Sequence, residues 1–277
     1  MLHYYYVMIS LKKESTGVSA TVISIGIQKG GVGKTTTSCI TSFILARDHR
    51  VLAVDMDSQG NLSEVLTRKS IYEFEDRTVL NAIYDEDASP YIVSVSENLD
   101  VLPSDDILAT LDRQIVNPVG KFVKVIEQLR KHYDYIIIDS PPHLGTQTVC
   151  SLSACDYAVI ILQSEPLCFK ALDRYLQLLE LVKQQLNPKL SVAGILTTMF
   201  DSRASIELSI IDQARTDYED WVFDVVIRRR SRLKEFTLTG ISDRTAQDRD
   251  ALEQYEAFVK ELRTRCEQAP TVSDPVE

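Results

Sequence analysis

One short segment combines glycines, lysines and threonines in an order that suits phosphate binding. It reads Lys29-Gly30-Gly31-Val32-Gly33-Lys34-Thr35-Thr36. An apolar, β-branched run at 22–27 precedes it, and a helix-compatible segment at 37–47 follows. In a strand–loop–helix context, glycines let backbone N–H groups face a phosphate, and the helix N-terminus adds positive potential. Lys34 can then reach the outer phosphates of a nucleotide, and the Thr35 hydroxyl can bind Mg²⁺.

Two carboxylates follow the next apolar strand, which is expected at 51–55. Asp55 and Asp57 stand two residues apart in the run Val-Asp-Met-Asp-Ser-Gln-Gly-Asn that begins at Val54. The C-terminal ends of strands are where α/β sheets bind ligands. These acids are therefore expected near the phosphate loop.

A third acid closes a strongly apolar strand. Residues 133–142 read Tyr-Asp-Tyr-Ile-Ile-Ile-Asp-Ser-Pro-Pro, with the acid at Asp139. This is a Walker B pattern, in which a buried strand delivers a carboxylate to the shell of a bound Mg²⁺. We expect Asp139 to have that role.

A basic run contrasts with the formal net charge of −10. Five cations stand within seven residues, namely Arg228, Arg229, Arg230, Arg232 and Lys234. Contacts from such residues to nucleic-acid phosphates give salt-dependent, sequence-independent affinity. Arg228 directly continues an apolar strand and is expected to face inward, so Arg230 and Arg232 are the preferred candidates for contact with DNA. The other interpretation is a solvated loop, or one paired with carboxylates.

These residues need an alternating α/β framework to position them. Strands are expected at 22–27, 51–55, 99–102, 135–138, 157–162, 191–197 and 221–227. Helices are expected at 34–47, 119–131, 146–153, 167–186, 203–217 and 246–264. The acidic, polar region 58–98 gives no clear assignment. We expect a flexible extension at 1–20, one domain at 21–264 and a disordered tail at 265–277.

The composition excludes several other classes. The five cysteines are irregularly spaced, which argues against a disulfide framework and for a reducing compartment. No C-x-x-C pair indicates zinc, and no apolar run approaches the ~20 residues that a membrane span needs. The apolar start of the chain lacks the basic region of a signal peptide.

Together, these blocks resemble the ParA/Soj-type partition ATPases, within the ParA/MinD group of P-loop ATPases. That group has a deviant Walker A loop, in which Lys29 would be the signature lysine, and Gln28 stands where ordinary P-loops have glycine. The resemblance covers about residues 21–264 and includes four motif blocks in family order. It implies a doubly wound, mostly parallel sheet with helices on both faces, and ATP and Mg²⁺ as cofactors.

The resemblance also implies roles for individual residues. Lys29 would reach the phosphates bound by the other subunit of an ATP-dependent homodimer, while Gly30 to Thr36 hold those of their own chain. Asp57 would orient the attacking water, and Asp55 would support the magnesium shell with Thr35 and Asp139. Met199, in a segment at 196–203 similar to a family motif, would lie near the base.

The implied function is partition of a plasmid or chromosome. The ATP-bound dimer would bind DNA non-specifically through the basic run, and a ParB-like, centromere-binding partner would stimulate hydrolysis and release it. The protein would be cytoplasmic and nucleoid-associated, without membrane binding.

Other functions within the same group remain open. A MinD-like positioner of the cell-division site needs a basic amphipathic C-terminal helix, and helix 246–264 instead has one apolar face suited to docking. A tyrosine kinase would want a tyrosine-rich tail, and a nitrogenase-iron-protein-like reductase would want cluster cysteines. A filament former switched by ATP is the non-enzymatic alternative.

Overall fold

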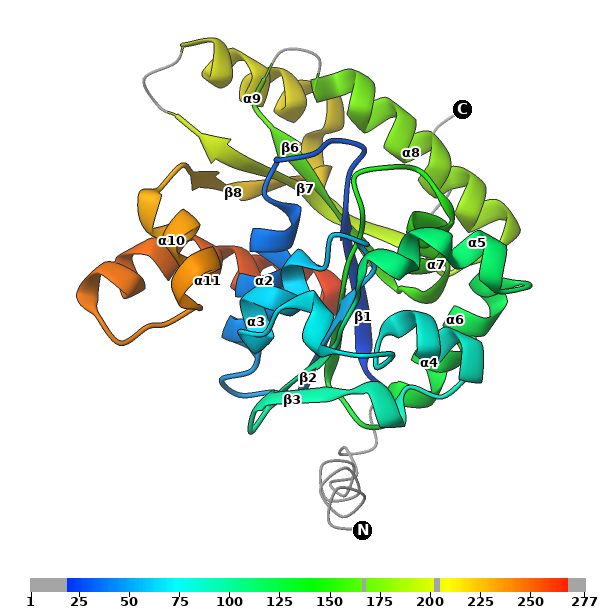
Figure 1. The fold of residues 1–277 in the computed structure, drawn as a ribbon. Coiled ribbons are helices and arrows are strands. Elements are labelled where there is room, and N and C mark those ends of the chain that lie inside the picture. Colours follow the sequence, from blue (N-terminus) through cyan, green and yellow to red (C-terminus); the bar gives the residue numbers. More distant parts are fainter. Residues whose placement is uncertain (1–18, 166–167, 202–204, 269–277) are drawn as a thin grey trace.

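A sheet of eight strands runs through the computed structural model, which describes residues 19–165, 168–201 and 205–268 (Figure 1). The strand order is β3-β4-β2-β5-β1-β6-β7-β8. β3 pairs with β4 antiparallel, and the other neighbours pair in parallel. The strands are β1 (Thr21–Gly26), β2 (Val51–Asp55), β3 (Val93–Ser96), β4 (Leu99–Leu102), β5 (Tyr135–Asp139), β6 (Tyr157–Gln163), β7 (Ser191–Phe200) and β8 (Val222–Arg228).

Helices cover both faces of this sheet. They are α2 (Lys34–Leu45), α3 (Asn61–Thr67), α4 (Val79–Asp85), α5 (Leu111–Gln114), α6 (Pro118–Leu129), α7 (Thr146–Ala154), α8 (Cys168–Gln185), α9 (Ser205–Tyr218), α10 (Ser231–Thr239) and α11 (Ala246–Gln268). Short 3₁₀ segments are η1 (Ile71–Glu73), η2 (Ser89–Tyr91), η3 (Asp106–Thr110) and η4 (Glu219–Trp221). In Figure 1, α2, α3, α10 and α11 lie on one side, and α4 to α8 lie on the other. The predicted doubly wound α/β fold is confirmed.

The central strands are apolar along their whole length because helices bury both of their faces. Each residue of β2 is buried, as are the last five residues of β1 and the last four of β5. Because β1 lies between β5 and β6, the order of connections reverses there. Ligands bind at such a switch point, beyond the carboxyl ends of the strands.

Several elements are not predicted by the sequence pattern. The region 58–98 contains α3, α4 and the edge strand β3, each of seven residues or fewer. Such short segments complete too few periods to show a pattern. α10 is not predicted either, because only Leu233 and Phe236 of its nine residues are buried.

The end of the domain also differs from the prediction. α11 continues to Gln268, so the assignment of 265–268 to a disordered tail is wrong. Arg265 explains the extension, since its guanidinium donates to the carbonyls of Asp220 and Val222 and pairs with Glu261. Of the flexible extension expected at 1–20, residues 1–18 lie outside the described residues, as do the tail at 269–277 and Ser202 and Arg203 of the family-like motif. The bound at residue 20 is wrong, because Ala20 is buried and its N–H donates to the Arg130 carbonyl over 2.9 Å.

Candidate nucleotide site

The phosphate loop joins the C-terminal end of β1 to the N-terminus of α2. Gly31 and Gly33 adopt φ values of 72° and 91°, in the left-handed region that favours glycine. Gly33 is also the N-cap of α2. The Thr198 hydroxyl, near the end of β7, donates to the Val32 carbonyl over 2.6 Å. The loop is thus shaped by its own glycines and held to β7, which lies two strands from β1 in the sheet.

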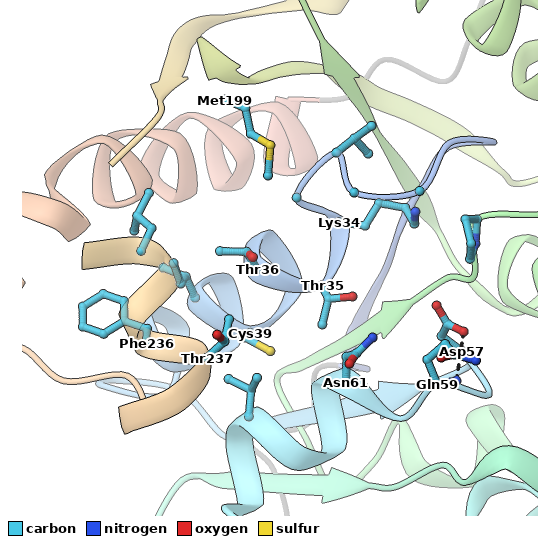
Figure 2. A pocket seen from close by; sticks show the side chains of 18 of the residues that line it. Lys34, Thr35, Thr36, Cys39, Asp57, Gln59, Asn61, Met199, Phe236 and Thr237 are labelled. Atoms are coloured by element: carbon cyan, nitrogen blue, oxygen red, sulfur yellow. Dashed lines mark hydrogen bonds between the residues drawn. The ribbon is translucent and has the colours of Figure 1, made fainter. Parts of the chain in front are cut away.

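A cavity of 480 Å³ opens over this loop. Figure 2 shows Lys34 and Asp57 toward one side of it and Phe236 toward the other. The predicted residues that line the cavity are Gly30, Gly31, Val32, Gly33, Lys34, Thr35, Thr36, Asp57 and Met199. The structure therefore brings three separate sequence motifs to one place.

Lys34 is the principal buried cation at the cavity. Its side chain is 6% exposed, and Nζ donates to the Lys29 carbonyl over 2.7 Å. Burial lowers the pKa of Lys34, while the charges of Asp139 and Asp57 act in the opposite direction. A cation with so little water around it interacts strongly with an anionic ligand.

Thr35 and Asp139 form the part of the site suited to Mg²⁺. The Thr35 hydroxyl donates to Asp139 Oδ2 and the Ser38 hydroxyl to Oδ1, each over 2.7 Å. Burial raises the pKa of Asp139, and these two hydrogen bonds lower it in part. In the described residues no cluster of three or more His, Cys, Asp or Glu side chains is placed to hold a metal. Mg²⁺ takes one or two protein oxygens and completes its shell with phosphate and water, so the Thr35 hydroxyl and the Asp139 carboxylate are the protein oxygens suited to it.

Asp55 and Asp57 differ in position although they are two residues apart. Asp55 is fully buried and accepts hydrogen bonds from the Ser63 N–H, the Ser63 hydroxyl and the Asp57 N–H at 2.9, 2.7 and 3.1 Å. Burial, and then the charge of Asp139, raise the pKa of Asp55. Asp57 lines the cavity, and its Oδ1 accepts from the Gln59 N–H. The hydrogen bonds of Asp55 order the loop that presents Asp57.

Lys29 belongs to the phosphate loop but does not line this cavity. Its ammonium is 2.7 Å from Glu165 Oε2, just beyond β6, and the two side chains are 30% and 46% exposed. Sequence reasoning does not identify Glu165, because nothing in its local sequence indicates a lysine partner.

A second cavity of 450 Å³ shares Gly31, Gly33 and Met199 with the first. Met199 has φ 59°, which is uncommon for a residue with a side chain. Such an outlier is typical of functional sites. This cavity is also lined by Arg228, Arg229, Arg230 and Lys234.

The basic run divides into paired and unpaired cations. Arg230 pairs with Asp250, and Arg232 pairs with Asp248 and Glu235. Among the described residues, the side chains of Arg228, Arg229 and Lys234 form no ion pair, and all three are exposed. The expectation that Arg228 faces inward is wrong, because Arg228 is exposed at the end of β8 and the buried position there is taken by its neighbour Ile227. The preference for Arg230 and Arg232 as DNA contacts stays a prediction, although carboxylates partly compensate the charges of these two residues.

Comparison with known proteins agrees with this geometry. An AAA domain family model matches residues 20–192. The sporulation initiation inhibitor protein Soj of Bacillus subtilis is 37% identical over 224 residues, which cover 77% of this chain and 86% of Soj. The chromosome partitioning protein ParA of Myxococcus xanthus is 37% identical over 226 residues, which cover 77% of each chain. This chain belongs to the ParA/Soj family of partition ATPases.

A solved structure extends the comparison to ligands. The cobyrinic acid a,c-diamide synthase of Mycobacterium smegmatis, with a bound ATP analogue and magnesium, is 25% identical. It superposes with a TM-score of 0.78 over 91% of this chain and 98% of its own. In that synthase, this fold therefore holds an ATP analogue together with magnesium.

One wall of this ParA/Soj-type site is not anticipated from the sequence. Three residues of α10 line the cavity, namely Leu233, Phe236 and Thr237, and so does Ile241, which follows the helix after Gly240. The only sequence signal for this wall is the pair Leu233 and Phe236 at helical spacing before Gly240.

A search of the described residues for membrane-spanning helices finds none with the length and apolar character that crossing a bilayer requires.

Proposed function

We propose that this partition ATPase acts as an ATP-dependent dimer that binds DNA without sequence preference and is released by ATP hydrolysis. The observation that carries the proposal is the convergence of Lys34, Thr35 and Asp57 on one cavity above the glycine loop. Its relatives Soj and ParA are named for sporulation control and chromosome partitioning, respectively.

In this proposal, the loop N–H groups and Lys34 hold the phosphates of ATP. Thr35 and Asp139 hold Mg²⁺, which neutralises charge on the transferred phosphoryl group when it is bound. Asp57 accepts a hydrogen bond from the attacking water and orients it. Asp55 supports the site indirectly, by fixing the Asp57 N–H and Ser63. Catalysis then consists of positioning and electrostatic stabilisation.

Lys29 is proposed to act on the other subunit. Its ammonium is partly exposed and does not line its own nucleotide cavity. A lysine in that position can exchange the Glu165 carboxylate for a phosphate that a second copy binds. Two such exchanges would close a symmetric dimer around two nucleotides.

DNA contact is proposed for Arg228, Arg229 and Lys234. These three cations are exposed and form no ion pair among the described residues. They can therefore contact a DNA phosphate without first breaking an ion pair. They line a cavity that shares Gly31 and Gly33 with the nucleotide site, so occupancy of one can influence the other. A ParB-like partner would stimulate hydrolysis, and the protein would be nucleoid-associated in the cytoplasm.

A MinD-like membrane role is less well supported. The apolar residues of α11, including Leu252, Tyr255, Phe258 and Val259, are buried within the domain. The helix therefore has no free apolar face to place on a lipid surface. Sedimentation with liposomes in ATP tests this alternative, and sedimentation in ATP without DNA tests filament formation.

The nucleotide assignment is tested by replacing the buried lysine. Lys34→Ala should lose detectable ATP binding by calorimetry while its circular dichroism spectrum remains that of the parent. Lys189→Ala, which removes an exposed lysine outside the cavity, should bind ATP like the parent. Parental ATP affinity in folded Lys34→Ala would show that the loop is not the nucleotide site.

A further inference from the structure

Arg232 bridges α11 to the wall of the nucleotide cavity. Its Nε lies 2.7 Å from Asp248 Oδ1, and its Nη1 lies 2.7 Å from Glu235 Oε2. The centre of the guanidinium is 5.2 Å from the centroid of the Phe236 ring, within the range of a cation–π contact. The side chain is 22% exposed. Arg232 is therefore tied on three sides.

The α11 end of this bridge is rigid. Asp248 is 1% exposed, and its second oxygen accepts from the Thr245 N–H. The Asp248 N–H in turn donates to the Thr245 hydroxyl, so the two residues cap the first turn of α11 reciprocally. α11 packs against β8 and α2. Asp248 is thus a fixed anchor for the guanidinium.

The α10 end of the bridge meets the cavity. Phe236 is 1% exposed and lines the cavity with Leu233 and Ile241. In Figure 2 it lies away from the Lys34 and Asp57 side. A nucleotide whose phosphates occupy the glycine loop therefore places its base and ribose toward α10.

Few interactions hold α10 in place. Only Leu233 and Phe236 of the helix are buried. At its C-terminal end, the Arg68 guanidinium donates to the Leu238 carbonyl, and Gly240 follows with φ 84°. At its N-terminal end, the ties are Arg230 to Asp250 and Arg232 to Asp248. Of these ties, only Arg232 also touches the ring that lines the cavity.

We propose that Arg232 is a positioning residue of the nucleotide site, which fixes α10 as the wall against the base by linking Asp248 to Phe236. This role deepens the proposed ATP-binding function and rests on it. It also removes Arg232 from the DNA-contacting set. Arg232 acts through Phe236 and does not touch the nucleotide.

The test compares two ligands that share phosphates but differ in the base. ATP and inorganic tripolyphosphate are each titrated into the full chain with Mg²⁺, by calorimetry. In Arg232→Ala, the Kd for ATP should rise on the order of tenfold, as expected for removal of one charge-assisted hydrogen-bonded pair. The Kd for tripolyphosphate should stay within about twofold of the parent, because the phosphate loop is unchanged.

Three further variants sharpen the assignment. Asp248→Asn keeps an oxygen for the Thr245 cap but weakens the ion pair with Arg232, so it should also raise the Kd for ATP. The double variant with Arg232→Ala should have a Kd close to that of Arg232→Ala alone, because both substitutions remove the same ion pair. Arg232→Lys keeps the charge without the planar guanidinium and should give an intermediate Kd. Arg244→Ala removes an exposed arginine near α11 and should match the parent for both ligands.

The possible outcomes separate the two proposals. An unchanged Kd for ATP in Arg232→Ala, or an equal rise for ATP and tripolyphosphate, overturns the positioning role. If Arg232→Ala does not fold, the same criteria apply to Arg232→Lys and Asp248→Asn. Failure of the parent to bind ATP overturns the proposed function itself, whatever the variants do.

Discussion

The ammonium of Lys29 and the carboxylate of Glu165 form an ion pair within one chain, 2.7 Å apart and 136 positions apart in sequence. The pair is partly exposed, and exposed pairs of this kind contribute only about 0–1 kcal/mol. It is therefore weak enough to be exchanged for a stronger interaction with phosphate. The structure shows Lys29 in the arrangement that must be broken if it acts on a second subunit.

Lys29→Ala should bind ATP with near-parental affinity but stay monomeric. The physical reason is that Lys34 and the loop remain, while the ammonium proposed to reach the other subunit is absent. Light scattering with a non-hydrolysable ATP analogue measures the dimer. Glu165→Gln is the matched control, since it frees Lys29 and should dimerise at an equal or lower protein concentration. A dimer of undiminished stability in Lys29→Ala would leave this residue an ordinary part of the loop.

Asp57→Ala should bind ATP and dimerise but hydrolyse ATP at a small fraction of the parental rate. Asp57 lines the cavity, but the cation that meets the phosphates is Lys34 and the partner of Thr35 is Asp139, so ATP binding should survive the removal of Asp57. The variant should then remain on DNA for longer, which a dissociation experiment in ATP measures. Asp106→Ala, at an exposed carboxylate in η3, is the control. Parental turnover in Asp57→Ala would show that another group orients the water.

Arg229→Ala should weaken binding to random-sequence duplex DNA more than Arg230→Ala does. The two residues are neighbours, but Arg230 is compensated by Asp250 and Arg229 forms no ion pair among the described residues. A titration at several salt concentrations with saturating ATP gives both affinity and slope. The log–log slope should become shallower by about 0.9 for each DNA phosphate that the variant no longer neutralises. Equal, negligible effects would place the DNA surface elsewhere.

The stability of the nucleotide-free chain should fall as pH rises above the usual carboxyl pKa of 3.8. Burial raises the pKa of both Asp55 and Asp139, so the folded chain binds more protons than the unfolded chain in this range. The free energy of unfolding then decreases with pH, by up to about 1.36 kcal/mol per pH unit for each group, until the raised pKa is passed.

Urea denaturation between pH 5 and 8 measures this slope. Asp139→Asn removes one titrating group and should flatten the slope, whereas Asp106→Asn, at an exposed carboxylate, should leave it unchanged. Identical slopes in the parent and Asp139→Asn would contradict the assignment of a raised pKa to Asp139.

The sequence by itself determined the parts of this protein whose chemistry is local. The glycine loop, Asp57 and Asp139 each follow an apolar strand directly, and the backbone of a strand–loop–helix unit fixes where such residues emerge. Parallel strands bring those ends to one edge of the sheet. That these motifs lie together could accordingly be predicted from their order and spacing, and one cavity gathers the loop, Asp57 and Met199.

Only the tertiary structure decided which charges are free. Glu165 is 136 residues from Lys29, and Asp248 and Asp250 are 16 and 20 residues from Arg232 and Arg230. α10 shows too few buried residues to be predicted from periodicity, yet it forms a wall of the site. Ion pairing depends on how helices pack, because a charge is compensated by whatever side chain the fold places within a few ångströms. In the sequence, the five cations resemble one basic patch. Among the residues that the structure describes, two of them form ion pairs with carboxylates and three do not.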